Sequence, residues 1–444
     1  MKNFFRIWFL LLIVKIAIAG FIPLIADEAY YWIWSLFPKL SYFDHPPMTS
    51  WLLWLGHFFD FGFSLVRLPS IIVGHFLWLI WYFIFKEFNL STKHFEYWLW
   101  LTVLSPLLGF GTILTTPDLS LLTFWSLSFY LLIRYLKNPS AQIASALGAA
   151  LGLAFLAKYI VVLFIPLLLI CLCNTKFRSQ FSWKYLPYTI VFGLLFCSPV
   201  LIWNFNNEWA SFQFQLKHGL HQEFFDWKWP VEYFFGQILA AFPLVAYWAW
   251  KNGQFKNSSE SKYFILSVFA FGPLAFFFFT SFRAPVEANW AIIGYPALYV
   301  LAVTHAAWNF KKQLITILFW FGCYTYITFA LVANKPSILH GKISEPYLYY
   351  SFTPLVEKYK PLYAINYQLA ASLWFNSKIP VYKVSEGSRY DFFDTFKESM
   401  PKENLFYLIK QQHHDLPPWI AKEGWKAVEV ESLSDNYLIL EVKK

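Results

Sequence analysis

The chain has 444 residues, of which 58% are hydrophobic and only 14% are charged, and its formal net charge is +9. Together with a mean hydropathy of +0.44, this composition excludes a soluble globular protein with an ordinary polar surface. We therefore predict a polytopic membrane protein. The positive charge is spread over the loops and the C-terminal region, which suits an anionic membrane surface and gives no support for nucleic-acid binding.

Apolar runs close to the ~20 residues that cross a ~30 Å hydrocarbon core recur from Phe4 to about Val332, which indicates helices and not a barrel. No small-residue cleavage site follows the first run, so we keep it as a permanent span. The four cysteines lie in or beside apolar runs, and neither a disulfide framework nor a zinc module is predicted. We predict about eleven spans, at residues 4–22, 66–85, 97–114, 117–136, 142–157, 159–173, 187–202, 231–250, 263–281, 290–308 and 313–332.

The distribution of lysine and arginine predicts the orientation of these spans. With a cytoplasmic N-terminus, the inner loops hold fourteen of these residues and the outer loops before residue 333 hold only six. The positive-inside rule therefore favours this orientation. Two outward loops, at about residues 25–65 and 203–230, are long enough to build a site.

The composition changes after Val332, where charged and polar residues return and no further span follows. We predict a transmembrane catalytic domain over residues 1–332 and a small soluble α/β domain over residues 333–444, on the outer side of the membrane. A helix is predicted around Tyr367–Phe375, and Ser434-Asp435-Asn436 is typical of a turn between the last two strands. Strands are predicted at Pro380–Val384, Leu405–Ile409, Ala427–Val430 and Tyr437–Val442.

Two adjacent carboxylates, Asp27 and Glu28, stand where the first apolar run ends. Acidic groups at a membrane boundary are costly to desolvate and usually belong to a site that needs their charge. We interpret Asp27 as a catalytic base whose proton affinity is raised by its neighbour Glu28. The alternative is that the carboxylate caps a helix over Ala29–Leu36.

A second acidic position lies in the same outward loop, in the sequence Asp44-His45-Pro46-Pro47. The functional interpretation makes Asp44 a second carboxylate and His45 a contact to a substrate phosphate, whereas the alternative is a turn before a helix. His218 lies in the other long outward loop. Asp44 and His218 together are candidate ligands of a divalent cation, although a lone surface histidine is the alternative.

Lys158 interrupts an otherwise apolar stretch and falls at a predicted outward turn. A lysine there must reach the interface or pair with an anion, and we interpret it as a ligand of a donor phosphate. Arg283 and Glu287, with Asn289, form a further polar cluster that could bind substrate or be an ordinary loop. Asp118, at the start of another span, is explained by helix capping.

The chain contains no Walker or dinucleotide-binding glycine motif, and no nucleotide pool exists on the outer face. A transferase there has to use a donor that the membrane delivers, such as a sugar on a polyprenyl phosphate. That donor already carries its leaving group, so the enzyme needs a base for the acceptor hydroxyl and cations for the phosphate. The outward loops supply both kinds of residue.

Several segments of the chain carry a resemblance to a known family. They are Asp27–Ser35, Ser41–Pro47, Thr116–Asp118, Leu156–Tyr159, Ser198–Asn204, Trp209–Phe214, Val286–Trp290, Asn366–Ala370 and Ser388–Asp391. Together they resemble the PMT_2-type, glycosyltransferase family 39 branch of the GT-C membrane glycosyltransferases, whose relatives include dolichyl-phosphate-mannose protein mannosyltransferases and lipid A aminoarabinose transferases.

The resemblance implies an all-α GT-C fold and an inverting transfer in which Asp27 is the catalytic carboxylate. It implies that the first outward loop forms a wall of the active site. The lipid A relatives have an acidic-basic pair where Asp44-His45 stands, a lysine similar to Lys158 near the lipid phosphate, and a histidine in the loop of His218. They also have an arginine three residues after the catalytic aspartate, where this chain has Tyr30.

From these observations we expect a glycosyltransferase of the bacterial inner membrane whose active site faces outward. The expected donor is a polyprenyl-phosphate sugar, and the acceptor is lipid A, another envelope glycan or lipid, or a secreted protein. No cofactor is predicted apart from a candidate divalent cation. The alternatives are a transporter or flippase of lipid-linked sugars, which would show repeat symmetry and midplane charges, and a catalytically idle scaffold with the same fold.

Overall fold

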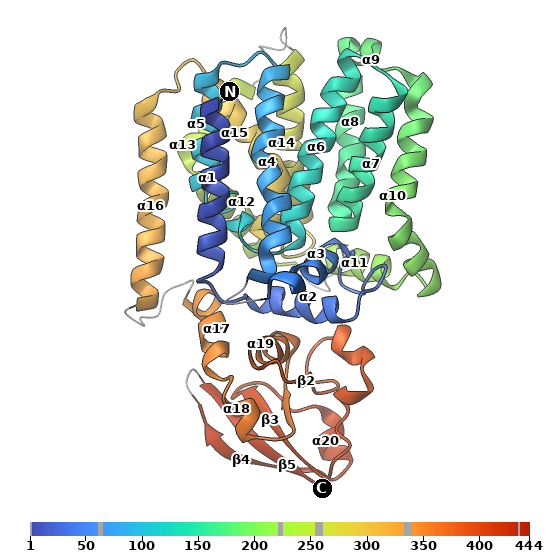
Figure 1. Ribbon diagram of the computed structural model, residues 1–444, viewed down its shortest axis with the longest axis vertical. Coiled ribbons are helices and arrows are strands. Elements are labelled where there is room, and N and C mark those ends of the chain that lie inside the picture. Colours follow the sequence, from blue (N-terminus) through green and yellow to red (C-terminus); the bar gives the residue numbers. More distant parts are fainter. Residues whose placement is uncertain (1, 61–64, 221–224, 254–260, 333–339, 434–435) are drawn as a thin grey trace. The chain divides into compact units, whose positions relative to one another are not determined.

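The computed structural model describes residues 2–60, 65–220, 225–253, 261–332, 340–433 and 436–444 (Figure 1). Its contacts divide the chain into two compact units. The first, here the helical unit, comprises Met1–Ile18, His45–Thr49 and Arg67–Tyr326. The second, here the mixed unit, comprises Ala19–Asp44, Ser50–Val66 and Ile327–Lys444, so that most of the first predicted outward loop is grouped with the C-terminal residues.

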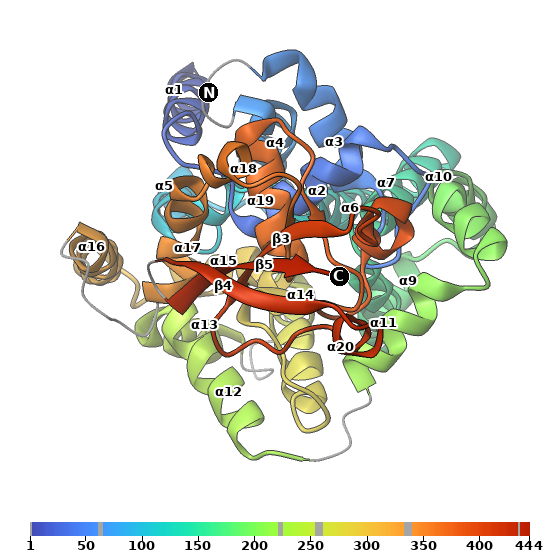
Figure 2. The same cartoon turned by 90° about the horizontal axis from the view of Figure 1, so that it is seen from below.

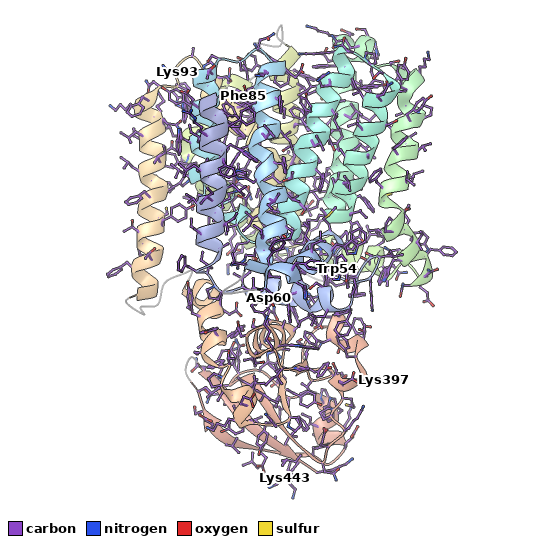
Figure 3. All side chains as sticks on the ribbon, in the orientation of Figure 1. Trp54, Asp60, Phe85, Lys93, Lys397 and Lys443 are labelled. Carbon is purple, nitrogen blue, oxygen red and sulfur yellow. The ribbon has the colours of Figure 1, made fainter. Side chains whose placement is uncertain are left out.

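The helical unit is built from long apolar helices, whose side chains fill the space between them (Figure 3). Its helices are α1 (Lys2–Ala19), α4 (Leu68–Glu87), α5 (Thr92–Leu104), α6 (Pro117–Lys137), α7 (Ala141–Ala157), α8 (Phe164–Cys173), α9 (Thr175–Gln180), α10 (Leu186–Asn206), α11 (Ala210–Leu220), α12 (Lys228–Ala241), α13 (Pro243–Gly253), α14 (Ser261–Thr280), α15 (Tyr295–Thr304) and α16 (Phe310–Val332).

Fewer helices of the described residues are long and apolar enough to cross a membrane than the eleven spans predicted. Among the described residues, four helices qualify as spans: Leu65–Glu87, Pro117–Lys137, Trp183–Asn206 and Lys262–Thr280. The predicted span 231–250 is divided into α12 and α13, which meet at 92°, because Phe242 has a φ of 69° and Pro243 starts a new helix. The predicted span 97–114 ends at Leu104, ahead of Ser105-Pro106, since proline disfavours helix at the preceding residue.

Close packing of α7 against α10 depends on small residues. An added Cβ at Gly148 would lie 2.2 Å from the Thr189 carbonyl oxygen, and one at Gly152 would lie 2.6 Å from the Phe196 Cβ. Such approaches are typical of helix interfaces in membranes, where apolar burial against lipid offers no driving force and packing decides. In Figure 1, α6, α7 and α10 lie in this order along the bundle.

The mixed unit contains a five-stranded sheet in the order β2-β1-β3-β5-β4 (Figure 2). Strand β1 pairs in parallel with β2 and β3, whereas β5 pairs antiparallel with β3 and β4. The strands are β1 (Leu362–Ala364), β2 (Tyr382–Lys383), β3 (Leu405–Gln411), β4 (Lys426–Ser432) and β5 (Tyr437–Lys443). The four predicted strands are all present, and the three-residue β1 is an addition. The predicted turn at Ser434 and Asp435 lies outside the described residues.

Helix α19 (Tyr367–Ser377) forms where it was predicted and packs against α2 (Ala26–Leu36). Nine of the eleven residues of α2 are buried, including Trp32 and Trp34. They share one apolar core with residues of α19 and of the sheet, such as Trp374 and Ile409. This core holds the start of α2 firmly against the C-terminal part of the chain. The mixed unit also contains α3 (Met48–Gly56) in part, α17 (His340–Ser351), α18 (Leu355–Lys358) and α20 (Pro418–Lys422).

Candidate active site

The first turn of α2 separates the roles of the two adjacent carboxylates. Ile25 is the N-cap residue, and its backbone N–H donates to Oε2 of Glu28 at 3.1 Å. Glu28 is fully buried, so its carboxylate satisfies one of the helix N–H groups that have no partner within the helix. Asp27 is exposed and, among the described residues, its carboxylate makes no hydrogen bond or ion pair. Glu28 therefore caps the helix, and the carboxylate of Asp27 is available to bind a substrate proton.

The carboxyl group of Asp27 has a perturbed pKa. Although the side chain is accessible to solvent, protein atoms surround it closely, and this desolvation raises its pKa from 3.8 to about 6. The charge of Glu345 also raises the pKa, Arg389 lowers it, and Glu28 and Asp44 raise it further. A carboxylate with a pKa near 6 is still mostly ionised at neutral pH and binds a proton more strongly than an ordinary aspartate, as a general base requires.

Asp44 is buried and held at both oxygens. Nη1 of Arg389 donates to Oδ1 of Asp44 at 2.6 Å, and the Tyr30 hydroxyl donates to Oδ2 at 2.7 Å. The same hydroxyl accepts a hydrogen bond from the backbone N–H of Phe392 at 2.8 Å. Only 4% of the Asp44 side chain is exposed, against 44% for Arg389. The second predicted carboxylate is thus a structural partner of an arginine that lies 345 positions further along the chain.

An aromatic residue of α19 completes this group. The ring centroids of Tyr367 and Tyr30 lie 4.4 Å apart. The guanidinium carbon of Arg389 lies 5.0 Å from the centroid of the Tyr367 ring, within cation–π range. Burial, followed by the charge of Asp27, raises the pKa of Tyr367 to about 12. Tyr367 therefore stays a neutral phenol, and the nearby charge of Asp27 helps to keep it protonated.

The segment that carries Arg389 is anchored by a buried lysine. Nζ of Lys383 lies 2.8 Å from Oδ2 of Asp391 and 2.5 Å from Oδ2 of Asp394, and it donates to the Arg389 carbonyl at 2.9 Å. The side chains of Lys383 and Asp391 have no exposed surface. Burial raises the pKa of Asp391 to about 6 against the opposing charge of Lys383. This cluster fixes the backbone from Arg389 to Asp394, and with it the guanidinium that binds Asp44.

A second polar group lies in the helical unit. Nζ of Lys158 is 2.8 Å from Oδ1 of Asp118, and Nδ2 of Asn289 donates to Oδ2 of Asp118 at 2.7 Å. Lys158 follows the last residue of α7, Asp118 lies in the first turn of α6, and Asn289 lies in the 3-10 helix Ala288–Gly294. Lys158 thus has a protein anion as partner. The N-cap residue of α6 is Thr116, with no side-chain cap hydrogen bond, so the predicted capping role of Asp118 is wrong. Its two carboxylate oxygens instead join three elements of the unit.

The remaining predicted site residues are His45, Arg283, Glu287 and His218. His45 is partly exposed, and Arg283 and Glu287 are exposed in the segment between α14 and the next 3-10 helix, with no ion pair between them. His218 lies in α11, but its side chain is outside the described part of the structure. Within the described ranges no group of three or more histidine, cysteine, aspartate or glutamate residues could hold a metal ion. The suggested Asp44–His218 cation site stays a prediction, because the side chain of His218 lies outside the described residues.

Sequence reasoning gave no role to Arg389, Tyr30 or Lys383. Ser388–Asp391 was among the segments that carried the family resemblance, and this was the only available signal for Arg389. Lys383 lies within a predicted strand, where a charged residue is ordinarily taken to face solvent. Nothing in the local pattern shows that its ammonium group is buried between two carboxylates.

The comparisons with known proteins agree with the family resemblance. Residues 44–203 match the dolichyl-phosphate-mannose-protein mannosyltransferase family, PMT_2. The lipid A galacturonosyltransferase RgtD of Rhizobium johnstonii is 23% identical over 300 residues, which are 62% of this chain and 59% of RgtD. The chain thus spans about three fifths of the length of this curated relative.

Among solved structures, ArnT from Cupriavidus metallidurans matches in the apo state with a TM-score of 0.71 and in complex with undecaprenyl phosphate with a TM-score of 0.73. Each match has 14% sequence identity and covers 99% of this chain and 98% of ArnT. These matches agree with the resemblance to the PMT_2 family over residues 44–203, and the fold of this chain is similar to that of ArnT.

Proposed function

We propose that this protein is an inverting membrane glycosyltransferase that uses a polyprenyl-phosphate sugar donor and a lipid acceptor of the cell envelope, with lipid A as the first candidate. The observation that carries the proposal is the state of Asp27. Its carboxylate is exposed, makes no hydrogen bond within the described residues, and has a pKa of about 6. The family match and the lipid A relative support the class of reaction.

In the proposed reaction, an oxygen of Asp27 accepts the proton of the acceptor hydroxyl while the oxygen of that hydroxyl forms a bond to the anomeric carbon of the sugar. The bond between the anomeric carbon and the phosphate oxygen breaks at the same time, and the polyprenyl phosphate leaves with its electron pair. Attack opposite the leaving group inverts the configuration. Positioned general bases typically contribute about 10²–10⁴-fold to such a step.

We assign Lys158 and His45 to the donor phosphate, and Arg283 and Glu287 to the further binding of substrate. Because Lys158 is paired with Asp118 at 2.8 Å, a phosphate would have to share its ammonium group with that carboxylate. Arg389 and Tyr30 hold Asp44 in place, so we give Asp44 the role of orienting the arginine beside the base. Glu28 is assigned to the helix terminus and to the electrostatic environment of Asp27.

We place the protein in the bacterial inner membrane, with Asp27 and residues 333–444 on the outer face. The charge distribution of the loops and the relative that acts on lipid A support this placement. A cysteine introduced at Lys397, an exposed position of the mixed unit (Figure 3), should react with a membrane-impermeant reagent added to whole spheroplasts. Labelling only after lysis would reject the orientation.

The chemistry is tested with purified protein in liposomes that contain an undecaprenyl-phosphate sugar and lipid A. Asp27→Asn should lower the transfer rate by at least 10²-fold while leaving undecaprenyl-phosphate binding unchanged. Glu28→Gln is the matched control, because a glutamine oxygen can still accept the hydrogen bond from Ile25, and this variant should keep most of the activity. Transfer by Asp27→Asn at the wild-type rate would reject Asp27 as the base.

A further inference from the structure

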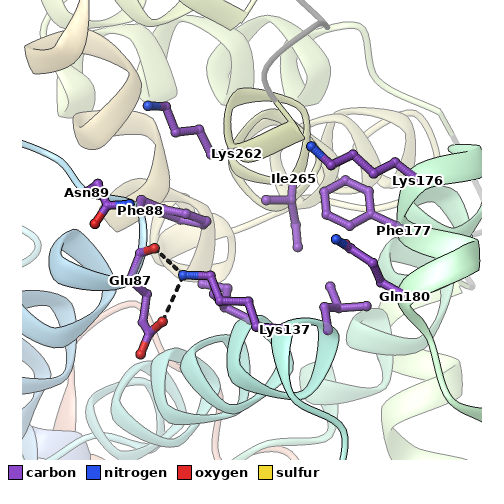
Figure 4. Close-up of a pocket in the computed structure, with 11 residues that line it drawn as sticks. Glu87, Phe88, Asn89, Lys137, Lys176, Phe177, Gln180, Lys262 and Ile265 are labelled. Carbon is purple, nitrogen blue, oxygen red and sulfur yellow. Dashed lines mark hydrogen bonds and ion pairs between the residues drawn. The ribbon is translucent and has the colours of Figure 1, made fainter.

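A pocket of about 420 Å³ opens in the helical unit, remote in sequence from the residues assigned to catalysis (Figure 4). It lies where α4 and α6 end, beside α9 and the start of α14. Its volume is within the range of about 300–1,000 Å³ that is usual for small-molecule sites. The lining residues are Glu87, Phe88, Asn89, Ile133, Leu136, Lys137, Lys176, Phe177, Gln180, Lys262 and Ile265.

The lining combines an apolar base with a cationic rim. Five of its side chains are apolar and buried: Phe88, Ile133, Leu136, Phe177 and Ile265. Three lysines from three different helices, together with two side-chain amides, provide the polar part. A site of this composition suits an amphiphile that has an anionic group next to apolar atoms, whereas a fully hydrated inorganic anion would gain nothing from the apolar base.

The charges of the lining leave a positive excess. Its one carboxylate, Glu87, is bound by Lys137 at 2.9 Å and by Arg134 at 3.5 Å, as the dashed lines to Lys137 in Figure 4 show. Three lysines against one glutamate make the formal charge of the lining +2. In Figure 4 the side chains of Lys176, from α9, and Lys262, from α14, lie across the pocket from Lys137.

The position of the pocket relative to the spans selects the kind of ligand. Three of the four helices that are long and apolar enough to cross a membrane have an end here: α4 ends at Glu87, α6 ends at Lys137, and the third such segment begins at Lys262. The ends of spans lie at the depth of the lipid headgroups. Basic pockets between membrane helices at this depth are typical sites for anionic lipid headgroups.

We propose that this pocket binds the phosphate of an anionic phospholipid, with Lys176 and Lys262 on the phosphate and the apolar base in contact with the glycerol and first acyl carbons. The site is distinct from the residues assigned to the transfer reaction. Its occupant would tie α9 and α14 to the ends of α4 and α6.

The test uses the full-length protein in detergent and native mass spectrometry, with phosphatidylglycerol, cardiolipin and phosphatidylcholine as probes. Phosphatidylglycerol and cardiolipin should bind in preference to phosphatidylcholine. The double variant Lys176→Ala/Lys262→Ala should bind them about 30-fold more weakly, from roughly fivefold per lysine. Lys176→Arg/Lys262→Arg should restore binding, which shows that charge at these positions is what matters.

The matched control is Lys184→Ala/Lys311→Ala, which removes two exposed lysines of the same unit that do not line the pocket. It should bind lipid as the wild type does, and an equal loss in this control would reject the pocket in favour of diffuse attraction. Inorganic phosphate at millimolar concentration should not displace the lipid. Displacement by phosphate alone would identify a soluble anion as the ligand and overturn the proposal.

Discussion

The most demanding prediction concerns Lys383, which holds the segment that carries Arg389. Replacing it with methionine keeps the approximate length of the side chain and removes the ammonium group from between Asp391 and Asp394. Both carboxylates then lose their closest cation, at 2.8 and 2.5 Å, and the carbonyl of Arg389 loses a donor at 2.9 Å. The substitution therefore breaks a buried ion cluster and leaves its anions behind.

The expected cost follows from the burial of this cluster. Removing one partner of a buried ion pair typically costs about 3–5 kcal/mol, because the remaining charge is uncompensated. Since the pKa of Asp391 is already raised to about 6, this carboxyl group will bind a proton in the variant and relieve part of the cost. Because the folded protein binds this proton more strongly than the unfolded chain does, protonation of Asp391 stabilises the fold at low pH. This stabilisation is lost as pH rises through about 6. The variant should thus be most destabilised at pH 8 and least at pH 5.

Hydrogen exchange of the full-length protein measures the loss of stability close to the substituted residue. The N–H of Phe392 donates to the Tyr30 hydroxyl at 2.8 Å and should be protected in the wild type. At 1.4 kcal/mol for each factor of ten, a cost of about 3–5 kcal/mol corresponds to exchange roughly 100- to 4,000-fold faster in Lys383→Met. The exposed Lys397→Met is the control and should change stability by less than about 0.5 kcal/mol. Unchanged protection of Phe392 in Lys383→Met would refute the anchoring role.

Three further predictions concern the base, the buried pair of the helical unit and its helix packing. The rate of transfer, as kcat/KM, should fall as pH drops through about 6, the pKa of Asp27, and Arg389→Met should move this midpoint upward because the guanidinium lowers that pKa. Lys158→Met should destabilise the helical unit by about 3–5 kcal/mol, since it leaves Asp118 buried without its cation. Adding Asp118→Asn should restore most of the thermal stability but not the affinity for undecaprenyl phosphate. Gly148→Leu should lower the thermal unfolding temperature, because even a Cβ at this position meets a carbonyl oxygen at 2.2 Å.

The controls for these predictions use conservative replacements. Arg389→Lys keeps the positive charge and should leave the pH midpoint near that of the wild type, whereas a midpoint that does not move in Arg389→Met would exclude the coupling to Asp27. Full recovery of donor binding in the double variant at Asp118 and Lys158 would show that Lys158 has only a structural role. A Gly148→Leu protein as stable as the wild type would mean that α7 and α10 can separate at little cost.

Much of the fold follows from local sequence patterns. The apolar runs predict the helices of the bundle, and the alternation around Leu405–Ile409 and Tyr437–Val442 predicts β3 and β5. The break at Phe242 was missed because its cause is a single positive φ followed by proline within a continuous apolar run. Strand β1 was missed because three residues between two neighbouring strands carry no periodicity of their own.

The sequence by itself determined the membrane class, the separate C-terminal composition and the prominence of Asp27, because hydrophobicity and acidic residues at the end of an apolar run are properties of short segments. Only the tertiary structure decided that Glu28 caps α2 while Asp27 does not, and that Arg389 binds Asp44 across 345 positions. Ion pairs and burial depend on which segments meet in space. Residues such as Lys383, whose neighbours come from a separate loop, therefore acquire their role only in the folded chain.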